Sequence, residues 1–240
     1  MTVLDYFEVF GYLFVLISFV FCMIASANVN STFRRYQKQF SRRGITAAEA
    51  ARMVLRAGGA TGVQIARTHG NLTDHFDPRD NTIYLSEAVF DSTSTAAIGV
   101  AAHEAGHAVQ HAVGYLPIRI RAAIIPVTNI GARFAPLLIM IGLFLSIYAA
   151  FPFGYELALL GVFFYSFSVI FQLVTLPTEF NASARAMAAL KNENILDDVE
   201  LVGARKTLTA AAMTYVASLA ASLIQLIRLF AIVTSGRRRD

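Results

Sequence analysis

Four long runs of the chain contain no Asp, Glu, Lys or Arg and consist mostly of apolar residues. A helix needs about 20 such residues to cross the hydrocarbon core of a bilayer. The runs are residues 9–27, 134–155, 157–178 and 207–227. The pattern therefore predicts four membrane-crossing helices, with the middle two joined as a hairpin around Gly154, Tyr155 and Glu156.

The stretch between the first two runs has the mixed polarity of a small folded region. Thr46 followed by Glu49 predicts a capping box at the start of a helix that ends near Gly58. The further elements expected here are a strand at 63–66, a turn at 77–81, a strand at 82–85 and a helix at about 95–111 with Ser92 or Ser94 as its N-cap.

These patterns predict a mainly α multi-pass membrane protein that carries one small α+β region. Five segments follow from the order of the runs. They are an N-terminal anchor at 1–27, the α+β region at 28–123, the hairpin at 124–178, a helical segment at 179–206, and a last membrane helix with a basic tail at 207–240.

The composition of the 240 residues agrees with a membrane protein. Hydrophobic residues make up 56% and charged residues 15%, which is too apolar for an ordinary soluble domain or a disordered chain. The single cysteine, Cys22, excludes an intramolecular disulfide. The net charge of +4 comes mostly from basic residues beside the apolar runs. We therefore expect anionic lipid of the bilayer, and not nucleic acid, as their partner.

Basic residues predict the orientation of the chain. Arg34, Arg35, Lys38, Arg42 and Arg43 follow the first apolar run directly. By the positive-inside rule they place 28–123 in the cytoplasm, and two further crossings return 179–206 to the same side.

The two ends of the chain leave alternatives open. The first run is expected to be a retained anchor, because Asp5 and Glu8 precede it where a signal peptide would carry basic residues. At the other end, a fourth crossing would put Arg237, Arg238 and Arg239 outside, against the positive-inside rule. Alternatively, the last helix, which contains Gln225 and Arg228, lies along the membrane surface or re-enters.

The expected helix at 95–111 contains His103, Glu104 and His107, which form the pattern His-Glu-x-x-His. Positions i and i+4 project from one helix face, so both imidazoles can bind one Zn²⁺, with Glu104 beside them. His111 lies about 12 Å further along the axis, too far for the same ion. The alternative is an alanine-rich amphipathic helix with two ordinary histidines on its polar face.

A catalytic zinc site needs three protein ligands and an open position, so a third ligand is expected elsewhere. The predicted hairpin returns the chain to the same membrane face just before Glu179, the first carboxylate there. From the residues alone, Glu179 is equally well a metal ligand or the solvated start of a helix.

Three segments carry a resemblance to a known family: 71–78, 103–111 and 171–185. They resemble the neutral zinc metallopeptidase family of YugP-like membrane proteins, over nearly the whole chain. More distantly, the order of motifs looks like the membrane gluzincins of the HtpX and CAAX-protease type. The resemblance implies a zincin-like region at the cytoplasmic membrane face, Zn²⁺ as the cofactor, peptide hydrolysis, and Glu179 as the third ligand.

The chain departs from the gluzincin pattern at one position. Those proteins carry Glu-x-x-Ala-Asp, whereas this chain has Ser183 in place of the Asp. An Asp there would normally orient a ligating imidazole by a hydrogen bond. Ser183 or Asn181 is expected to supply a neutral hydrogen bond instead.

The expected chemistry is hydrolysis of a protein or peptide, including membrane proteins, by a zinc-activated water with Glu104 as the general base. The strand at 82–85 is expected to be an edge strand that pairs with the substrate. Asp74 and His75 are expected in a loop before it, where His75 could stabilise the oxyanion.

Two rival functions remain open at this point. One is a non-catalytic membrane scaffold with a structural zinc, in which His75 would complete a closed site. The other is an enzyme with the same metal chemistry that acts on a lipid or prenylated substrate.

Overall fold

The computed structural model describes residues 3–149 and 151–236, with the side chains of 3–9 and 236 left out. Arg237, Arg238 and Arg239, on which the orientation of the last helix depended, lie outside the described residues. The chain forms two compact units. The helical unit comprises the described parts of Met1–Ile24, Ile120–Thr175 and Tyr215–Asp240, and the site unit comprises Ala25–Arg119 and Leu176–Thr214.

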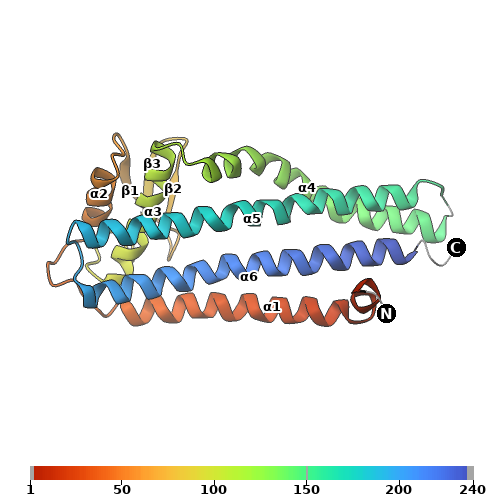
Figure 1. Ribbon diagram of the computed structural model, residues 1–240, viewed down its shortest axis with the longest axis horizontal. Helices are drawn as coiled ribbons and strands as arrows, with labels where there is room; N and C mark the ends of the chain where they lie inside the picture. The colour runs from red at the N-terminus through yellow and green to blue at the C-terminus, as the bar shows by residue number, and fades with distance from the viewer. Residues whose placement is uncertain (1–2, 150, 237–240) are drawn as a thin grey trace. The chain divides into compact units, whose positions relative to one another are not determined.

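Four long helices, which Figure 1 labels, each have residues in both units. They are α1 (Val3–Tyr36), α4 (Leu116–Tyr148), α5 (Gly154–Asn192) and α6 (Asp198–Gly236). By length and composition, four stretches within them can cross a membrane: Phe10–Tyr36, Leu116–Tyr148, Gly154–Asn192 and Asp198–Ser235. The prediction of a mainly α multi-pass protein is therefore confirmed. Each helix is longer than its uncharged run, because the helical hydrogen bonding continues into the polar sequence beyond it.

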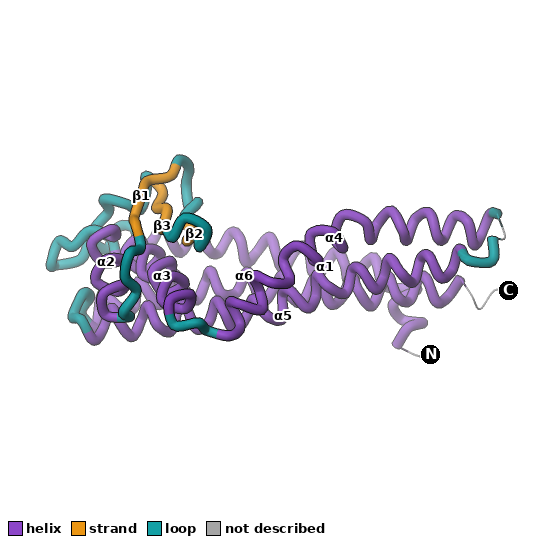
Figure 2. The backbone as a smooth tube through the Cα atoms, turned by 90° about the horizontal axis from the view of Figure 1, so that it is seen from above, coloured by secondary structure: helices purple, strands orange, loops and turns teal. Residues whose placement is uncertain are grey.

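Within the helical unit, small residues hold α4 and α5 together as an antiparallel pair (Figure 2). A Cβ atom on Gly142 would lie 2.4 Å from the backbone nitrogen of Ala158, and one on Gly131 would lie 2.6 Å from the carbonyl oxygen of Phe164. Only glycine permits backbones to approach so closely. The hairpin is thus confirmed, although its turn ends earlier than expected, since α5 already begins at Gly154.

Helices α1 and α6 also contact each other within the helical unit. The guanidinium of Arg228 lies over the ring of Tyr12 at 4.2 Å. The aliphatic part of Arg228 fills the space beside Gly11, where a Cβ atom would lie 3.1 Å from its Cγ. This arginine therefore packs against an aromatic face inside the unit.

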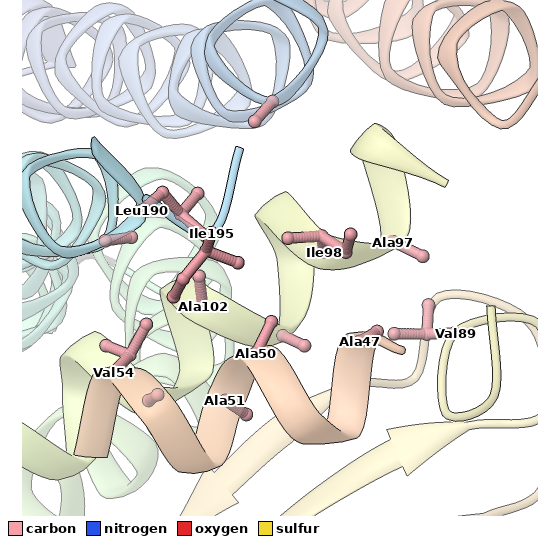
Figure 3. Packing of buried hydrophobic residues seen from close by; sticks show 14 of the residues in the cluster. Ala47, Ala50, Ala51, Val54, Val89, Ala97, Ile98, Ala102, Leu190 and Ile195 are labelled. Atoms are coloured by element: carbon pink, nitrogen blue, oxygen red, sulfur yellow. The ribbon is translucent and has the colours of Figure 1, made fainter. Parts of the chain in front are cut away.

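The site unit is built around α2 (Ala47–Ala57) and α3 (Thr95–Ala112). The predicted capping box is present, since Thr46 Oγ1 accepts from the Glu49 backbone N–H while the Glu49 carboxylate accepts from the Thr46 backbone N–H. Figure 3 shows the apolar face of α2 packed against α3 and the α5–α6 connection. Buried residues of this core include Val54, Ile98, Leu190 and Ile195.

A three-stranded sheet completes the site unit, with strands β1 (Gln64–Thr68), β2 (His75–Asp77) and β3 (Thr82–Ser86). Its order is β1-β3-β2, in which β3 is parallel to β1 and antiparallel to β2. The two predicted strands are confirmed. The prediction that 82–85 is an edge strand is wrong, because β3 lies in the centre of the sheet with Ile83 and Leu85 fully buried.

Asp74 lies in a loop as expected, but the prediction is wrong for His75, which begins β2. Two features position this short strand against β3, a turn conformation and a set of hydrogen bonds. Asn81 adopts a left-handed backbone conformation with φ of 55°, which reverses the chain within the turn after β2. The carboxylate of Asp74 accepts hydrogen bonds from the backbone N–H and the hydroxyl of Ser86. The sheet therefore gains an edge strand that local patterning did not indicate.

Candidate metal site

Helix α3 carries the His-Glu-x-x-His pattern and lies against α5 at close range. Its N-cap is Ser94, whose hydroxyl accepts from the backbone N–H of Ala97. Midway along α3, a Cβ atom on Gly106 would lie only 2.6 Å from the carbonyl oxygen of Ala182 on α5. A glycine one residue before His107 thus permits the approach of two backbones that brings α5 side chains to the histidines.

The structure brings together His103, His107 and Glu179 as a group that could hold a metal ion, with one ligand atom from each within 4.8 Å of the others. Glu179 Oε2 lies 3.2 Å from Nε2 of His103 and 3.5 Å from Nε2 of His107. The carboxylate is only 2% exposed. A buried carboxylate beside two imidazoles is a donor set that suits Zn²⁺, because the cation compensates the buried charge.

The other ring nitrogen of His103 is held by α5. Its Nδ1 lies 3.0 Å from the hydroxyl of Ser183. Ser183 stands one helical turn after Glu179, so one face of α5 supplies both the carboxylate and the hydrogen bond. Such a contact fixes the orientation of the ring and leaves Nε2 to face Glu179.

Gln110 holds the second imidazole and was not identified from the sequence. Its amide N–H groups donate to the backbone carbonyl of Thr178 at 2.8 Å and to Asn181 Oδ1 at 3.0 Å. Since both of these partners are acceptors, the amide oxygen Oε1 of Gln110 faces Nδ1 of His107 at 3.0 Å and accepts a hydrogen bond from its N–H. Asn181 in turn accepts from Arg185 at 2.8 Å, and among the described residues its hydrogen bonds are to Gln110 and Arg185, so it supports Gln110.

The spacing between Gln110 and His107 in the sequence is one indication that the two side chains are neighbours. Gln110 lies three residues after His107, which places both side chains on one face of α3. This spacing alone does not distinguish Gln110 from an exposed polar residue. Only the partners on α5 show that it is fully buried, with no exposed surface.

Glu104 lies on α3 beside the two histidines. Burial raises the pKa of its carboxyl group above the ordinary value, and the imidazoles of His103 and His107 partly oppose that rise. The carboxylates of Glu179 and Asp74 add to the rise. A carboxylate with a raised pKa is a stronger base than an exposed one, which suits proton transfer near neutral pH.

Asp74 and His75 are not part of the metal-holding group among the described residues. His75 is exposed, its Nδ1 lies 2.8 Å from the carbonyl oxygen of Thr73, and its ring stacks on Tyr84 at 5.1 Å. Asp74, which directly precedes β2, accepts hydrogen bonds from Ser86 at the end of β3. Burial raises the pKa of the Asp74 carboxyl group. Both residues therefore have structural partners in the hairpin.

His111 stands apart from the group, as the rise along the helix predicts. It is exposed, and its ring lies edge-on to that of Phe76 on β2 at 6.0 Å. This contact places the edge strand β2 beside the C-terminal half of α3. Within the described residues the metal-holding group thus has three members, which is the number that leaves a position open on a tetrahedral zinc.

Four helices that can cross a membrane, together with two histidines of a His-Glu-x-x-His helix that face a buried glutamate on α5, are the features of a membrane zinc metallopeptidase. The comparison with protein families gives the same class. Residues 11–234 match the family described as "Putative neutral zinc metallopeptidase". The chain belongs to this family of neutral zinc metallopeptidases, whose cofactor is zinc and whose substrates are proteins or peptides.

One curated relative is similar over most of both chains. It is the "Putative membrane protease YugP" of Bacillus subtilis (strain 168), which is 41% identical over 213 residues. The match covers 89% of this chain and 92% of the relative. The comparison with solved structures found no match.

Proposed function

We propose that the protein is a membrane-embedded, gluzincin-like metalloendopeptidase, with zinc held by His103, His107 and Glu179. One observation carries this proposal. The Nε2 atoms of both histidines face one buried carboxylate oxygen of Glu179. On the other side of each ring, Nδ1 of His103 contacts the hydroxyl of Ser183, and Nδ1 of His107 contacts the amide oxygen of Gln110. A site in which the ligands are oriented in advance loses little entropy when the ion binds.

Glu104 is the general base and acid in this proposal. A zinc ion held by His103, His107 and Glu179 would make a water molecule much more acidic and would polarise the substrate carbonyl. Glu104 then takes the proton from the attacking water and passes it to the leaving amine. The upward shift of its pKa by burial supports that role, because it makes the carboxylate a stronger base than an exposed one.

Strand β2 replaces 82–85 as the proposed substrate-pairing edge. It is an edge of the sheet, and Phe76 contacts His111 on the metal-site helix. An extended peptide that adds to β2 would run beside α3, with backbone hydrogen bonds supplying affinity without strict sequence preference. His75 lies on this strand, where its imidazole would contact the substrate and could donate to the oxyanion.

The basic residues in the last turn of α1 and directly after it support a cytoplasmic location for the site unit under the positive-inside rule. Because α5 carries Glu179 within a helix that can cross a membrane, segments of membrane proteins are the substrates that this arrangement favours. Accumulation of an uncleaved membrane protein in a deletion strain is the expected result. Cleavage restricted to freely soluble peptides would contradict this substrate class.

The proposal is tested by measuring bound zinc and peptide hydrolysis on the detergent-purified wild type and a Glu104→Gln variant. The amide cannot accept the proton from water, so we expect full zinc content with at least a hundredfold loss of hydrolysis. The conservative Glu104→Asp variant serves as the control and should keep part of the activity. Equal activity in Glu104→Gln and wild type would rule out the general-base role.

A further inference from the structure

A basic cavity lies at the C-terminal end of α1, within the site unit. Its volume is about 790 Å³, in the range of cavities that bind small molecules. The residues that line it are Ser31, Arg34, Arg35, Gln37, Lys38, Phe40 and Ser92. Three of the seven are cations and none is acidic, so the cavity favours an anionic ligand.

The cations of this cavity have no carboxylate partner in the described part of the chain. The basic residues that follow them are engaged: Arg42 pairs with Asp197, and Arg43 donates to the carbonyl oxygen of Asn194. No ion pair involves Arg34, Arg35 or Lys38 among the described residues, and all three are exposed. The charge around the cavity is therefore available to a ligand.

The other polar groups narrow the chemistry of that ligand. The hydroxyl of Ser31 donates to the carbonyl oxygen of Asn28, and that of Ser92 donates to Ser94. Binding would thus depend on the three cations and the Gln37 amide, all of which are donors. Several donors that line one cavity, guanidinium groups among them, match the oxygens of a phosphate or phosphodiester.

The position of the cavity along the chain indicates the source of this phosphate. Arg34 and Arg35 lie in the last turn of α1, at the end of the stretch Phe10–Tyr36 that can cross a membrane. Phe40, which is 63% exposed, supplies an apolar wall beside the cations. Cations and an exposed aromatic ring together, directly after a membrane-crossing helix, suit a ligand that has both a phosphate and acyl chains.

We propose that this cavity binds the headgroup of an anionic phospholipid, with its phosphate held by Arg34, Arg35 and Lys38. The site is separate from the metal group and does not depend on hydrolysis. It would fix the cytoplasmic end of α1 at the depth of the lipid phosphates.

The test uses the full-length protein in a neutral detergent, titrated calorimetrically with dioctanoyl phosphatidylglycerol. We expect saturable binding that weakens about fivefold for each charge removed, hence about 25-fold in an Arg34→Gln/Arg35→Gln variant. The matched control, Arg52→Gln/Arg56→Gln, removes the same charge from a cavity whose lining residues include none from a stretch that can cross a membrane. Its affinity should stay within twofold of wild type.

The proposal would be overturned by unchanged affinity in Arg34→Gln/Arg35→Gln, by equal weakening in both double variants, or by binding of inorganic phosphate as tight as that of the lipid. The last result would indicate a free-anion site.

Dioctanoyl phosphatidylcholine, which has no net charge, should bind at least tenfold more weakly than phosphatidylglycerol. An Arg34→Lys/Arg35→Lys variant, which keeps the charge, should retain most of the affinity, and its loss would contradict the charge-based argument.

Discussion

Replacement of Gln110 by leucine tests how the site is held in place. The side chain is fully buried and makes three hydrogen bonds, to His107, Thr178 and Asn181. Leucine has a similar volume but forms none of them. The variant removes the acceptor of the buried His107 Nδ1 proton, at about 1–3 kcal/mol, and two further bonds worth about 1 kcal/mol each. We therefore expect a loss of about 3–5 kcal/mol in the free energy of unfolding.

The effect on zinc affinity should be separable from the effect on stability. Loss of a partner that orients a ligating histidine typically weakens metal binding by about 10- to 100-fold. The assay is competition for zinc between the folded protein and a chelating dye, alongside thermal unfolding. Ile195→Ala is the matched control, because it removes a fully buried core side chain outside the site at a cost of about 2–5 kcal/mol. Its folded form should keep wild-type zinc affinity.

The reasoning would be refuted if Gln110→Leu bound zinc as tightly as wild type. It would also fail if Ile195→Ala lost zinc affinity to the same degree, because general destabilisation would then explain both results. A difference of at least tenfold in zinc affinity between the two variants is the result that the hydrogen-bond geometry predicts.

Three other substitutions test separate parts of the site. Glu179→Ala should lose most bound zinc by elemental analysis, and full retention would exclude it as a ligand. Gly106→Ala should lower the unfolding temperature and the zinc content together, because its Cβ atom would lie 2.6 Å from the Ala182 carbonyl; an unchanged protein would contradict this packing. Ser183→Ala should weaken zinc binding about tenfold through His103, whereas Ser183→Asp should restore it; equal affinity in both would show that the contact is unimportant.

Much of the fold could be predicted from the sequence, because its strongest determinants are local. The uncharged runs set the membrane-crossing helices, and Thr46 and Glu49 form a capping box within one turn. The spacing of His103 and His107 likewise requires only the geometry of one helix. Glu179 was a candidate on position alone, and its family resemblance raised it to an expected ligand.

The rest depends on contacts between distant segments. Strand β2 has only three residues, and Asp74 holds it in place through Ser86, which lies twelve positions later. The order of the strands in the sheet could not be predicted from the sequence either, because β3 lies between two strands that precede it in the chain. Gln110 is a further case, since its burial depends on carbonyl and amide acceptors on α5.

The central claim is that His103, His107 and Glu179 hold zinc. X-ray absorption at the zinc edge of the purified wild type tests this most directly. The account predicts one zinc per chain with only nitrogen and oxygen ligands, including two imidazoles at about 2.0–2.1 Å. A sulfur ligand, a third or fourth imidazole, or a protein that binds no zinc would contradict it.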